Sequence, residues 1–334
     1  MANLRDVAAR AGVSVATASR VASGATRVSS ETREKVERAM RELLYVSPHR
    51  SETTGAIGIL VPEFANPVFP ALTEAMEKCA SEAGLATIIC NTAGSARREQ
   101  EYVHMLLERR VGGMIFICSE INDVRGEHSH YQQLLDQGAR IVFVNGDTVD
   151  LDITSIGVDE RAAGRLATEH LLGLGHTRIG FVAGFAYASP TRDKLAGRVD
   201  ALRTAGIDPN GLVAHADFTV EGGRAATRKL LKHPKGRPTG VICSNDLMAI
   251  GAIHESWAHG LNFPHDISVV GFDGTDLATW VEPKLTTIQQ PIPELAAAAI
   301  GALAGTNGAA TPRYVFRPRL RKGATTAAPP PAVP

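Results

Sequence analysis

The stretch LRDVAARAGVSVATASRV, residues 4–21, decides how the N-terminal part of this chain folds. We expect a helix over residues 4–11 that ends at Gly12, because glycine readily adopts the left-handed backbone that terminates helices. A short turn through Val13 follows, and Ser14 can cap a second helix. Two short helices joined by such a turn form a helix-turn-helix, whose second helix enters the major groove of DNA.

A third helix completes this unit within residues 3–44. Asn3 can cap the first helix, with Asp6 in its first turn, and Ser29 can cap the third. Apolar residues recur at helical spacing in the third helix, at Val36, Ala39, Met40, Leu43 and Leu44. Helices this short are not stable alone, so the three are expected to pack on one another.

Charge and composition narrow the class of protein. Residues 1–50 hold nine Lys/Arg and five acids, a net charge of +4, whereas the whole chain is formally neutral. A basic head suits a polyanion partner, although a solvated helix surface is equally compatible with this charge. The N-terminus lacks the apolar core of a signal peptide, and no apolar run could span a membrane, so we expect a cytoplasmic protein. The four cysteines never form CxxC and are expected to be reduced thiols.

From Ala56 the pattern changes to alternating strands and helices. Helical stretches such as 71–84 and 98–110 separate short apolar runs. The runs lie at 56–62, 86–91, 112–118, 140–145, 178–184, 240–245 and 268–273. Apolar strands alternating with helices predict parallel sheets covered by helices on both faces. The series is too long for one small sheet, so we expect two doubly wound α/β subdomains with a cleft between them.

Four segments follow from this pattern. We expect a helix-turn-helix headpiece over 1–45 and a polar linker over 46–55 with no evident hinge helix. The two-subdomain core then covers 56–325, and an Ala/Pro-rich tail over 326–334 is expected to be disordered.

The motifs of this chain resemble those of the LacI/GalR family of transcription regulators. The resemblance covers about residues 3–325 and follows the family in order, through the segments 7–21, 28–45, 63–69, 97–115, 158–184, 242–252, 266–276 and 283–291. It implies a homodimer or tetramer with DNA headpieces and a core of the periplasmic sugar-binding-protein type. It also implies double-stranded operator DNA and a small-molecule effector as partners.

Within the headpiece, Arg20 is the main candidate for reading a base, because a guanidinium can meet both acceptors of a guanine edge. Val15 and Ala16 match the family's specificity pair, and the hydroxyls near helix starts would hold phosphates or simply cap the helices. The expected DNA-binding residues are Asn3, Leu4, Ser14, Val15, Ala16, Thr17, Ser19, Arg20, Ser23, Ser29 and Thr32.

The linker departs from the family. Relatives run from the headpiece into the core through a motif like P-N-x-x-A-R-x-L, whose leucine wedges into the minor groove. Here Tyr45 reaches Ile57 in twelve steps, and the A-R-x-L part is missing. The family also usually has Asn at the position of Ser23. We therefore expect looser headpieces, less DNA bending and more tolerance in half-site spacing.

Ligands of doubly wound folds bind at the carboxyl ends of the strands. Arg192 matches the family position that clamps ligand oxygens, and Asn245 and Asp273 match its hydrogen-bonding pair. Aromatic side chains can stack on a sugar or a base. The expected effector-binding residues are Phe69, Asn145, Arg192, Phe218, Asn245, Asp273 and Gln290. Relatives often carry Asp and Arg where this chain has Asn145 and Gly146, which departs from the usual sugar-binding mode.

Structural roles compete at several of these positions. Asp273 could cap a turn, the two phenylalanines could be plain core, and Asp246 is expected to cap the helix that follows it. No GxGxxG, GxxxxGK[ST] or GxSxG motif supports an enzyme, and no cofactor is expected. His128 and His130 lack further ligand partners nearby in the sequence, which argues against a metal site.

The sequence thus predicts a transcription regulator, a repressor of carbohydrate genes that a sugar relieves, and no enzyme. Two alternatives remain open. An extracytoplasmic sugar-binding protein would share the core but not the headpiece, and a purine-responsive regulator would use its ligand as a corepressor.

Overall fold

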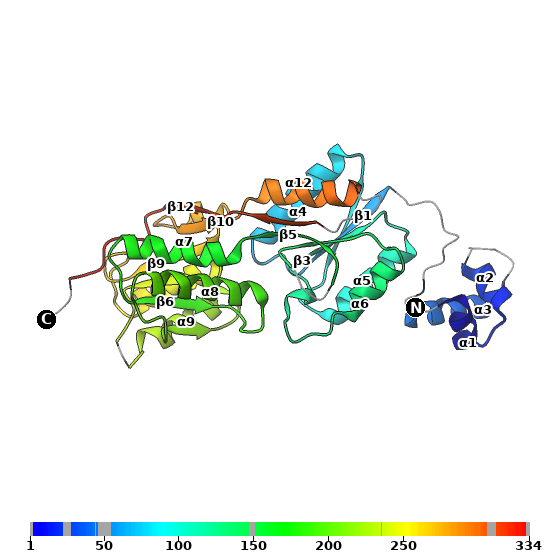
Figure 1. Cartoon of the computed structure of the whole chain (residues 1–334), viewed down its shortest axis with the longest axis horizontal. Coiled ribbons are helices and arrows are strands. Elements are labelled where there is room, and N and C mark those ends of the chain that lie inside the picture. Colours follow the sequence, from blue (N-terminus) through cyan, green and yellow to red (C-terminus); the bar gives the residue numbers. More distant parts are fainter. Residues whose placement is uncertain are drawn as a thin grey trace.

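The computed structural model describes residues 3–22, 28–43, 45, 55–146, 151–234, 236–305 and 312–331. Its first three helices form the expected headpiece: α1 (Leu4–Ala11), α2 (Val15–Ala22) and α3 (Ser30–Glu42) (Figure 1). Asn3 Oδ1 accepts hydrogen bonds from the backbone N–H groups of Arg5 and Asp6, and the Asp6 carboxylate accepts from the Asn3 N–H. Gly12 ends α1 with φ 66°, as predicted.

The headpiece has its own small core. The fully buried residues are Val7, Ala8, Ala18, Val21, Val36 and Ala39, which come from all three helices. Arg10 Nε lies 2.5 Å from Glu42 Oε2, so α1 and α3 are also joined by an exposed ion pair. The small apolar side chains let the three helices pack closely, and each stabilises the others.

The first α/β subdomain contains a parallel six-stranded sheet in the order β11-β5-β4-β3-β1-β2. Its strands are β1 (Ala56–Val61), β2 (Ala86–Asn91), β3 (Met114–Ile117), β4 (Ile141–Val144), β5 (Thr154–Val158) and β11 (Arg313–Phe316). Its helices are α4 (Val68–Glu82), α5 (Ala96–Glu108), the 3-10 turn η1 (Glu120–Asn122), α6 (Ser129–Asp136) and α12 (Ile292–Gly305).

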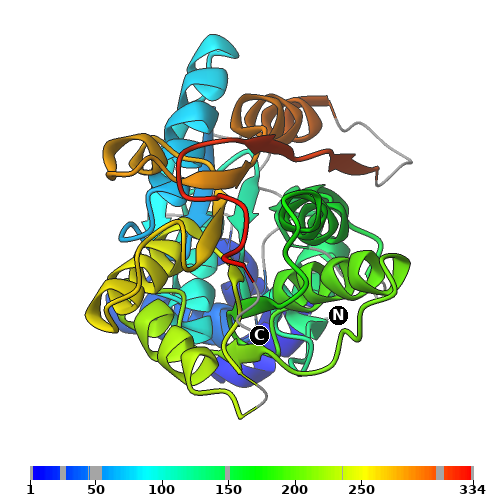
Figure 2. The same ribbon diagram turned by 90° about the vertical axis from the view of Figure 1, so that its left-hand side faces the viewer.

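The second subdomain has a six-stranded sheet in the order β12-β10-β9-β8-β6-β7, in which only β12 is antiparallel. Its strands are β6 (Ile179–Ala183), β7 (Val213–His215), β8 (Gly240–Cys243), β9 (Ser268–Asp273), β10 (Thr286–Gln289) and β12 (Arg319–Arg321). Its helices are α7 (Glu160–Gly173), α8 (Ser189–Thr204), α9 (Val220–Leu231), α10 (Asp246–Ala258) and α11 (Leu277–Trp280). Figure 2 shows the helices α7 and α8 on one side of the second sheet and α9 and α10 on the other side.

The chain crosses between the two subdomains three times, between β5 and α7, between β10 and α12, and between β11 and β12. The crossings are short, and one cluster of buried apolar residues continues from the first sheet into the second. The carboxyl ends of the parallel strands therefore lie where the subdomains meet, as the sequence predicted. No helix among the described residues is long and apolar enough to cross a membrane.

All seven apolar runs predicted as strands are strands. The sequence pattern did not predict five further strands, β5, β7, β10, β11 and β12. They are short and carry polar residues, as in TTIQ of β10 and RLR of β12, so periodicity alone does not mark them.

The C-terminal tail differs from its expected disorder from residue 326 onward. His170 Nε2 lies 3.0 Å from Thr326 Oγ1, and the carbonyl of Ala327 accepts from Ser268 Oγ and lies 2.9 Å from His176 Nε2. Burial lowers the pKa of His176, which favours its neutral form. These hydrogen bonds give Thr326 and Ala327 defined partners, which the expected disorder of the tail from residue 326 did not predict. Residues 332–334 lie outside the described residues.

Two glycines let α7 and α8 touch. A Cβ on Gly197 would overlap the carbonyl oxygen of Arg161, and one on Gly164 would overlap that of Lys194. Gly301 in α12 has no atom within 4 Å of such a Cβ. We predict that Gly197→Ala lowers the free energy of unfolding by about 1–3 kcal/mol, because the helices must separate.

The control Gly301→Ala should raise the free energy of unfolding by about 0.5–1 kcal/mol, since alanine favours the helix. Urea denaturation of both variants checks this pair. Equal stabilities for Gly197→Ala and the unchanged protein would contradict the close packing of α7 on α8.

Candidate DNA interface and ligand cleft

Helix α2 has one buried and one exposed face. Ala18 and Val21 are buried in the headpiece core, whereas Val15, Ala16 and Arg20 are exposed. Val15 is 45% exposed. The exposed face therefore offers two apolar groups and one guanidinium, the chemistry that contacts thymine methyl groups and guanine edges.

The hydroxyls near the helix starts act as caps. Ser14 Oγ accepts from the Thr17 N–H at 3.1 Å, and Ser29 Oγ accepts from the Thr32 N–H at 3.3 Å. These four side chains and Asn3 are at least partly exposed, so capping leaves them accessible to phosphate oxygens.

The remaining DNA-binding candidates differ in position. Ser19 is half-buried, and Leu4 packs against the headpiece core, which gives that side chain a structural role. Ser23 lies outside the described residues.

A chain of four side chains joins the subdomains at the cleft. Asn66 Nδ2 donates to Asp273 Oδ2 at 3.3 Å, and Gln290 Nε2 donates to Asp273 Oδ1 at 2.8 Å. Gln290 Oε1 in turn accepts from Asn145 Nδ2 at 2.9 Å. Asn66 and Asn145 follow strands of the first sheet, whereas Asp273 ends β9 of the second. Three predicted residues thus meet here, and Asn66 was missed.

Asp273 combines a strained backbone with a buried carboxyl group. It has φ 117°, a backbone conformation that side chains other than glycine rarely adopt. Burial, and next the charge of Asp246, raise the pKa of Asp273 well above its ordinary value. A strained and buried acid is typical of functional sites. The hydrogen bonds from Asn66 and Gln290 hold Asp273 in this conformation.

Lys194, which the sequence did not single out, is a buried cation at the cleft. Lys194 is 6% exposed, its Nζ lies 2.6 Å from Glu160 Oε2 and 3.8 Å from the ring centre of Phe272. The predicted Arg192 lies near the start of the same helix, α8, and is exposed. The helical spacing of Lys194, Gly197 and Ala201 on the buried face would have placed Lys194 inward.

Asn245, and not Asp246, caps α10. Asn245 Oδ1 accepts from the Met248 N–H at 2.8 Å, and its Nδ2 donates to the carbonyl of Phe218 at 3.0 Å. Asp246 is the first residue of the helix, buried, and its carboxylate accepts from Thr287 Oγ1 and the Gly274 N–H. The prediction for Asp246 was wrong because the cap lies one residue earlier, with extended backbone at Asn245.

The two predicted aromatic residues occupy different surroundings. Phe69 is half-buried against the main core, in agreement with the structural alternative. Phe218 lies on the backbone of Gly184 and meets the edge of Phe185, which stacks on Tyr187 at 5.1 Å. Phe185 is 36% exposed, so this aromatic group reaches the surface of the second subdomain.

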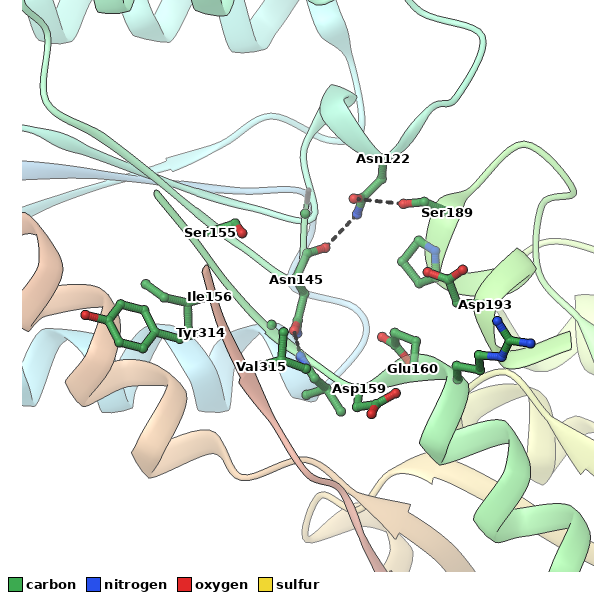
Figure 3. Close-up of a pocket in the computed structure, with 15 residues that line it drawn as sticks. Asn122, Asn145, Ser155, Ile156, Asp159, Glu160, Ser189, Asp193, Tyr314 and Val315 are labelled. Carbon is green, nitrogen blue, oxygen red and sulfur yellow. Dashed lines mark hydrogen bonds between the residues drawn. The ribbon is translucent and has the colours of Figure 1, made fainter. Parts of the chain in front are cut away.

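A cavity of about 330 Å³ lies beside this network (Figure 3). Its polar lining comes from both subdomains and includes Asn122, Asn145, Asp159, Glu160, Ser189 and Asp193. Of the predicted effector residues, only Asn145 lines it. The lining contains the three carboxylates of Asp159, Glu160 and Asp193 but only one guanidinium, that of Arg161. Arg161 Nε lies 2.7 Å from Asp200 Oδ2. The charged groups of the lining are thus mainly acidic, apolar side chains such as Ile156 and Val315 complete it, and its volume suits a small ligand.

Residues 122–125 connect the rim of this cavity to the second subdomain. Asn122 donates to the carbonyl of Asn145 at 2.8 Å and accepts from Ser189 Oγ at 3.4 Å (Figure 3). The Val124 N–H donates to the carbonyl of Tyr187, and the Arg125 guanidinium lies 3.7 Å from the centre of the Tyr187 ring. We call residues 122–125 the bridging segment. It carries no strand or motif that a sequence reading could recognise.

Comparison with known proteins agrees with this architecture. The family model "Bacterial regulatory proteins, lacI family" matches residues 3–47, and the model "Periplasmic binding protein-like domain" matches residues 168–326. The transcriptional regulator MalR of Streptomyces coelicolor is 36% identical over 338 residues, covering 98% of this chain and 97% of its own.

Two solved structures are similar over almost the whole chain. The transcriptional regulator CelR–cellobiose complex has a TM-score of 0.74 and 29% identity, covering 97% of this chain and 100% of that one. The lac repressor dimer bound to operator and the anti-inducer ONPF has a TM-score of 0.72 and 29% identity, covering 98% and 99%. These proteins are DNA-binding regulators and not enzymes. The chain belongs to the lacI family of bacterial regulatory proteins.

Proposed function

We propose that this regulator is a repressor whose operator binding is relieved by a neutral sugar in the cleft. The observation that carries the proposal is the acidic, amide-lined cavity between the subdomains, beside side chains that join both of them. The similar CelR–cellobiose complex supports a sugar effector, and the similar lac repressor bound to operator supports a repressor.

The lining of the cavity favours hydroxyl groups without a negative charge. Amide and hydroxyl side chains such as Asn122 and Ser189 both donate and accept, and the carboxylates of Glu160 and Asp193 accept from sugar hydroxyls. A phosphate or carboxylate ligand would meet these like charges. The buried cation Lys194 is already paired with Glu160, so it offers an anion little compensation.

The contacts between the subdomains provide the two-state element that an effector needs. A ligand shifts an equilibrium only by its difference in affinity for the two states. In this structure the Asn145–Gln290 bond and the bridging segment hold one relative position of the subdomains. A sugar that replaces the Asn145–Gln290 or the Ser189–Asn122 hydrogen bond favours another relative position of the two subdomains. That shift changes the spacing of the two headpieces in a dimer.

The effector site extends from the cavity to the network beside it. Asn145 lines the cavity, and Asp273 and Gln290 adjoin it through hydrogen bonds. We assign the cationic role in this site to Lys194, in place of Arg192, because Lys194 is buried beside Glu160. Asn245, Phe69 and Phe218 act as its structural support.

The working form is a homodimer in the cytoplasm, where the operator is found. A two-fold dimer suits a pseudo-palindromic operator. Large apolar side chains are exposed on the core, with Trp280 at 76%, Trp257 at 48% and Ile89 at 46%. Burial of such side chains is the driving force of most subunit interfaces.

Selection of bound fragments from genomic DNA, with full-length protein, tests the DNA-binding part of the proposal. We expect an enriched two-fold motif with variable half-site spacing, because the linker is short and lacks the family's hinge sequence; residues 46–54 of that linker lie outside the described residues. One fixed spacing would argue against loose headpieces. Absence of any motif would contradict autonomous operator recognition.

Release of that operator by a panel of ligands tests the effector. Ribose, xylose, maltose and cellobiose serve as neutral sugars, glucose 6-phosphate as an anionic one, and guanine as a purine. We expect release by a neutral sugar and none by the phosphorylated one. Tighter operator binding with guanine would favour the purine-responsive alternative.

Arg20→Ala should weaken binding to the selected operator by about 1–3 kcal/mol and relax specificity at one base position. The reason is the loss of a guanidinium on the exposed face of α2. Fluorescence anisotropy at fixed salt measures the affinity. Arg97→Ala removes an equally exposed arginine from α5 and should change nothing. Equal affinities for the two variants would show that Arg20 does not read a base.

Asp193→Asn should weaken binding of the releasing sugar about tenfold or more, because a hydrogen bond to a charged acceptor is lost. Its neighbour Arg192 does not line the cavity, so Arg192→Ala should bind the sugar within about twofold of the unchanged protein. Isothermal titration calorimetry compares them. Weaker sugar binding by Arg192→Ala than by Asp193→Asn would place Arg192 in the site and exclude Asp193. Operator affinity without sugar should be equal in both variants.

A further inference from the structure

A second group of polar side chains lies inside the first subdomain, away from the cleft network. It consists of Glu99 near the start of α5, Glu120 at the start of η1 and His130 near the start of α6. One ligand atom from each lies within 4.8 Å of the other two. In the sequence, His128 and His130 lacked further ligand partners, which argued against a metal site. The fold supplies both partners.

Two atoms of this group are buried without a hydrogen-bond partner among the described residues. They are Glu120 Oε2 and His130 Nε2, each with less than 1 Å² of exposed surface and 3.8 Å apart. A small cavity of about 20 Å³ adjoins the group and is lined by Glu99, Gln100, Val103, His130 and Leu134, but not by Glu120. The two unpartnered atoms indicate a ligand, because buried polar atoms in folded proteins are nearly always paired.

We propose that Glu99, Glu120 and His130 bind a divalent transition-metal ion, with Zn²⁺ as the best match. Carboxylate and imidazole ligands bind Zn²⁺ at about 2.0–2.2 Å, so small rotations of the side chains would bring the three donors into range. An imidazole disfavours Mg²⁺ and Ca²⁺, which prefer oxygen ligands alone. With three protein ligands, a water molecule completes the coordination.

The surroundings orient the ligands. The Tyr131 hydroxyl donates to Glu99 Oε1, which fixes this carboxyl group. The His130 ring packs against the Tyr131 ring, with the ring centres 3.9 Å apart.

The position of the site gives metal binding a consequence for the cleft. Glu120 lies two residues before the bridging segment, which contacts Tyr187, Ala188 and Ser189 of the second subdomain. A bound ion ties the start of this segment to α5 and α6. It therefore stabilises one side of the contact between the subdomains, independently of which sugar binds.

Zinc binding to chelator-treated, full-length protein tests the proposal. Equilibrium dialysis against Zn²⁺, and thermal unfolding with and without it, give affinity and stabilisation. Co²⁺ as a second probe reports the ligands, because a thiolate would add a charge-transfer band. We expect one equivalent of Zn²⁺, a raised Tm and a cobalt spectrum without thiolate.

Variants assign the binding to these side chains. Glu120→Gln and His130→Gln should each weaken zinc binding more than about tenfold, since even residues outside the coordination sphere change affinity by 10- to 100-fold. The matched control is His104→Gln, which alters an exposed His–Glu pair on α5 and should bind as the unchanged protein does. Circular dichroism without metal confirms that each variant folds.

Three results would overturn the proposal: no stoichiometric Zn²⁺, a thiolate band with Co²⁺, or equal affinity in His130→Gln and His104→Gln. The first result would leave a water molecule as the occupant. None of them bears on operator binding or on the sugar, so a failure here is distinct from a failure of the proposed function.

Discussion

The two sheets meet at the carboxyl ends of their strands, and the hydrogen bonds that join them there control the rest of the molecule. Asp273, Gln290 and Asn145 form one connected path from the second sheet to the first. Each group in this path is buried or half-buried, so each needs its partner, and removing one leaves the next unsatisfied. The relative position of the subdomains is therefore sensitive to any ligand that competes for these bonds.

Burial of charge adds a second constraint in the same place. Lys194 and Glu160 come from α8 and α7, whose backbones touch through Gly164 and Gly197. Without that close approach the ion pair would be longer and weaker. An ion pair taken out of water contributes little net stability, because desolvation offsets much of the attraction. The Lys194–Glu160 pair affects ligand selectivity instead, because it fixes the Glu160 carboxylate at the wall of the cavity.

Local patterns along the chain were enough to predict the headpiece caps and the seven apolar strands. Asn3, Gly12 and Ser14 act within three residues of their own positions, so their roles are visible without a fold. The cleft was harder. Which of Arg192 and Lys194 faces inward depends on the packing of α8 against α7, and the cap at Asn245 shifts the role of Asp246 by one residue.

Long-range pairs were not predictable from one sequence. The partners of His130 lie ten and thirty-one positions away, and Asn66 reaches Asp273 across 207 positions. Only the fold brings these side chains together. The same holds for the tail, whose composition suggested disorder while His176 and Ser268, far earlier in the chain, hold it.

The three crossings also determine when each subdomain can be complete during synthesis. The first sheet needs β11, and its face needs α12, yet both are made after nearly all of the second subdomain. Leu295, Ala296, Ala299 and Ile300 of α12 belong to the main core. On the ribosome, the apolar surface under this helix stays uncovered until about residue 316 has emerged. The first subdomain is thus exposed to aggregation and to chaperones for most of the time that translation takes.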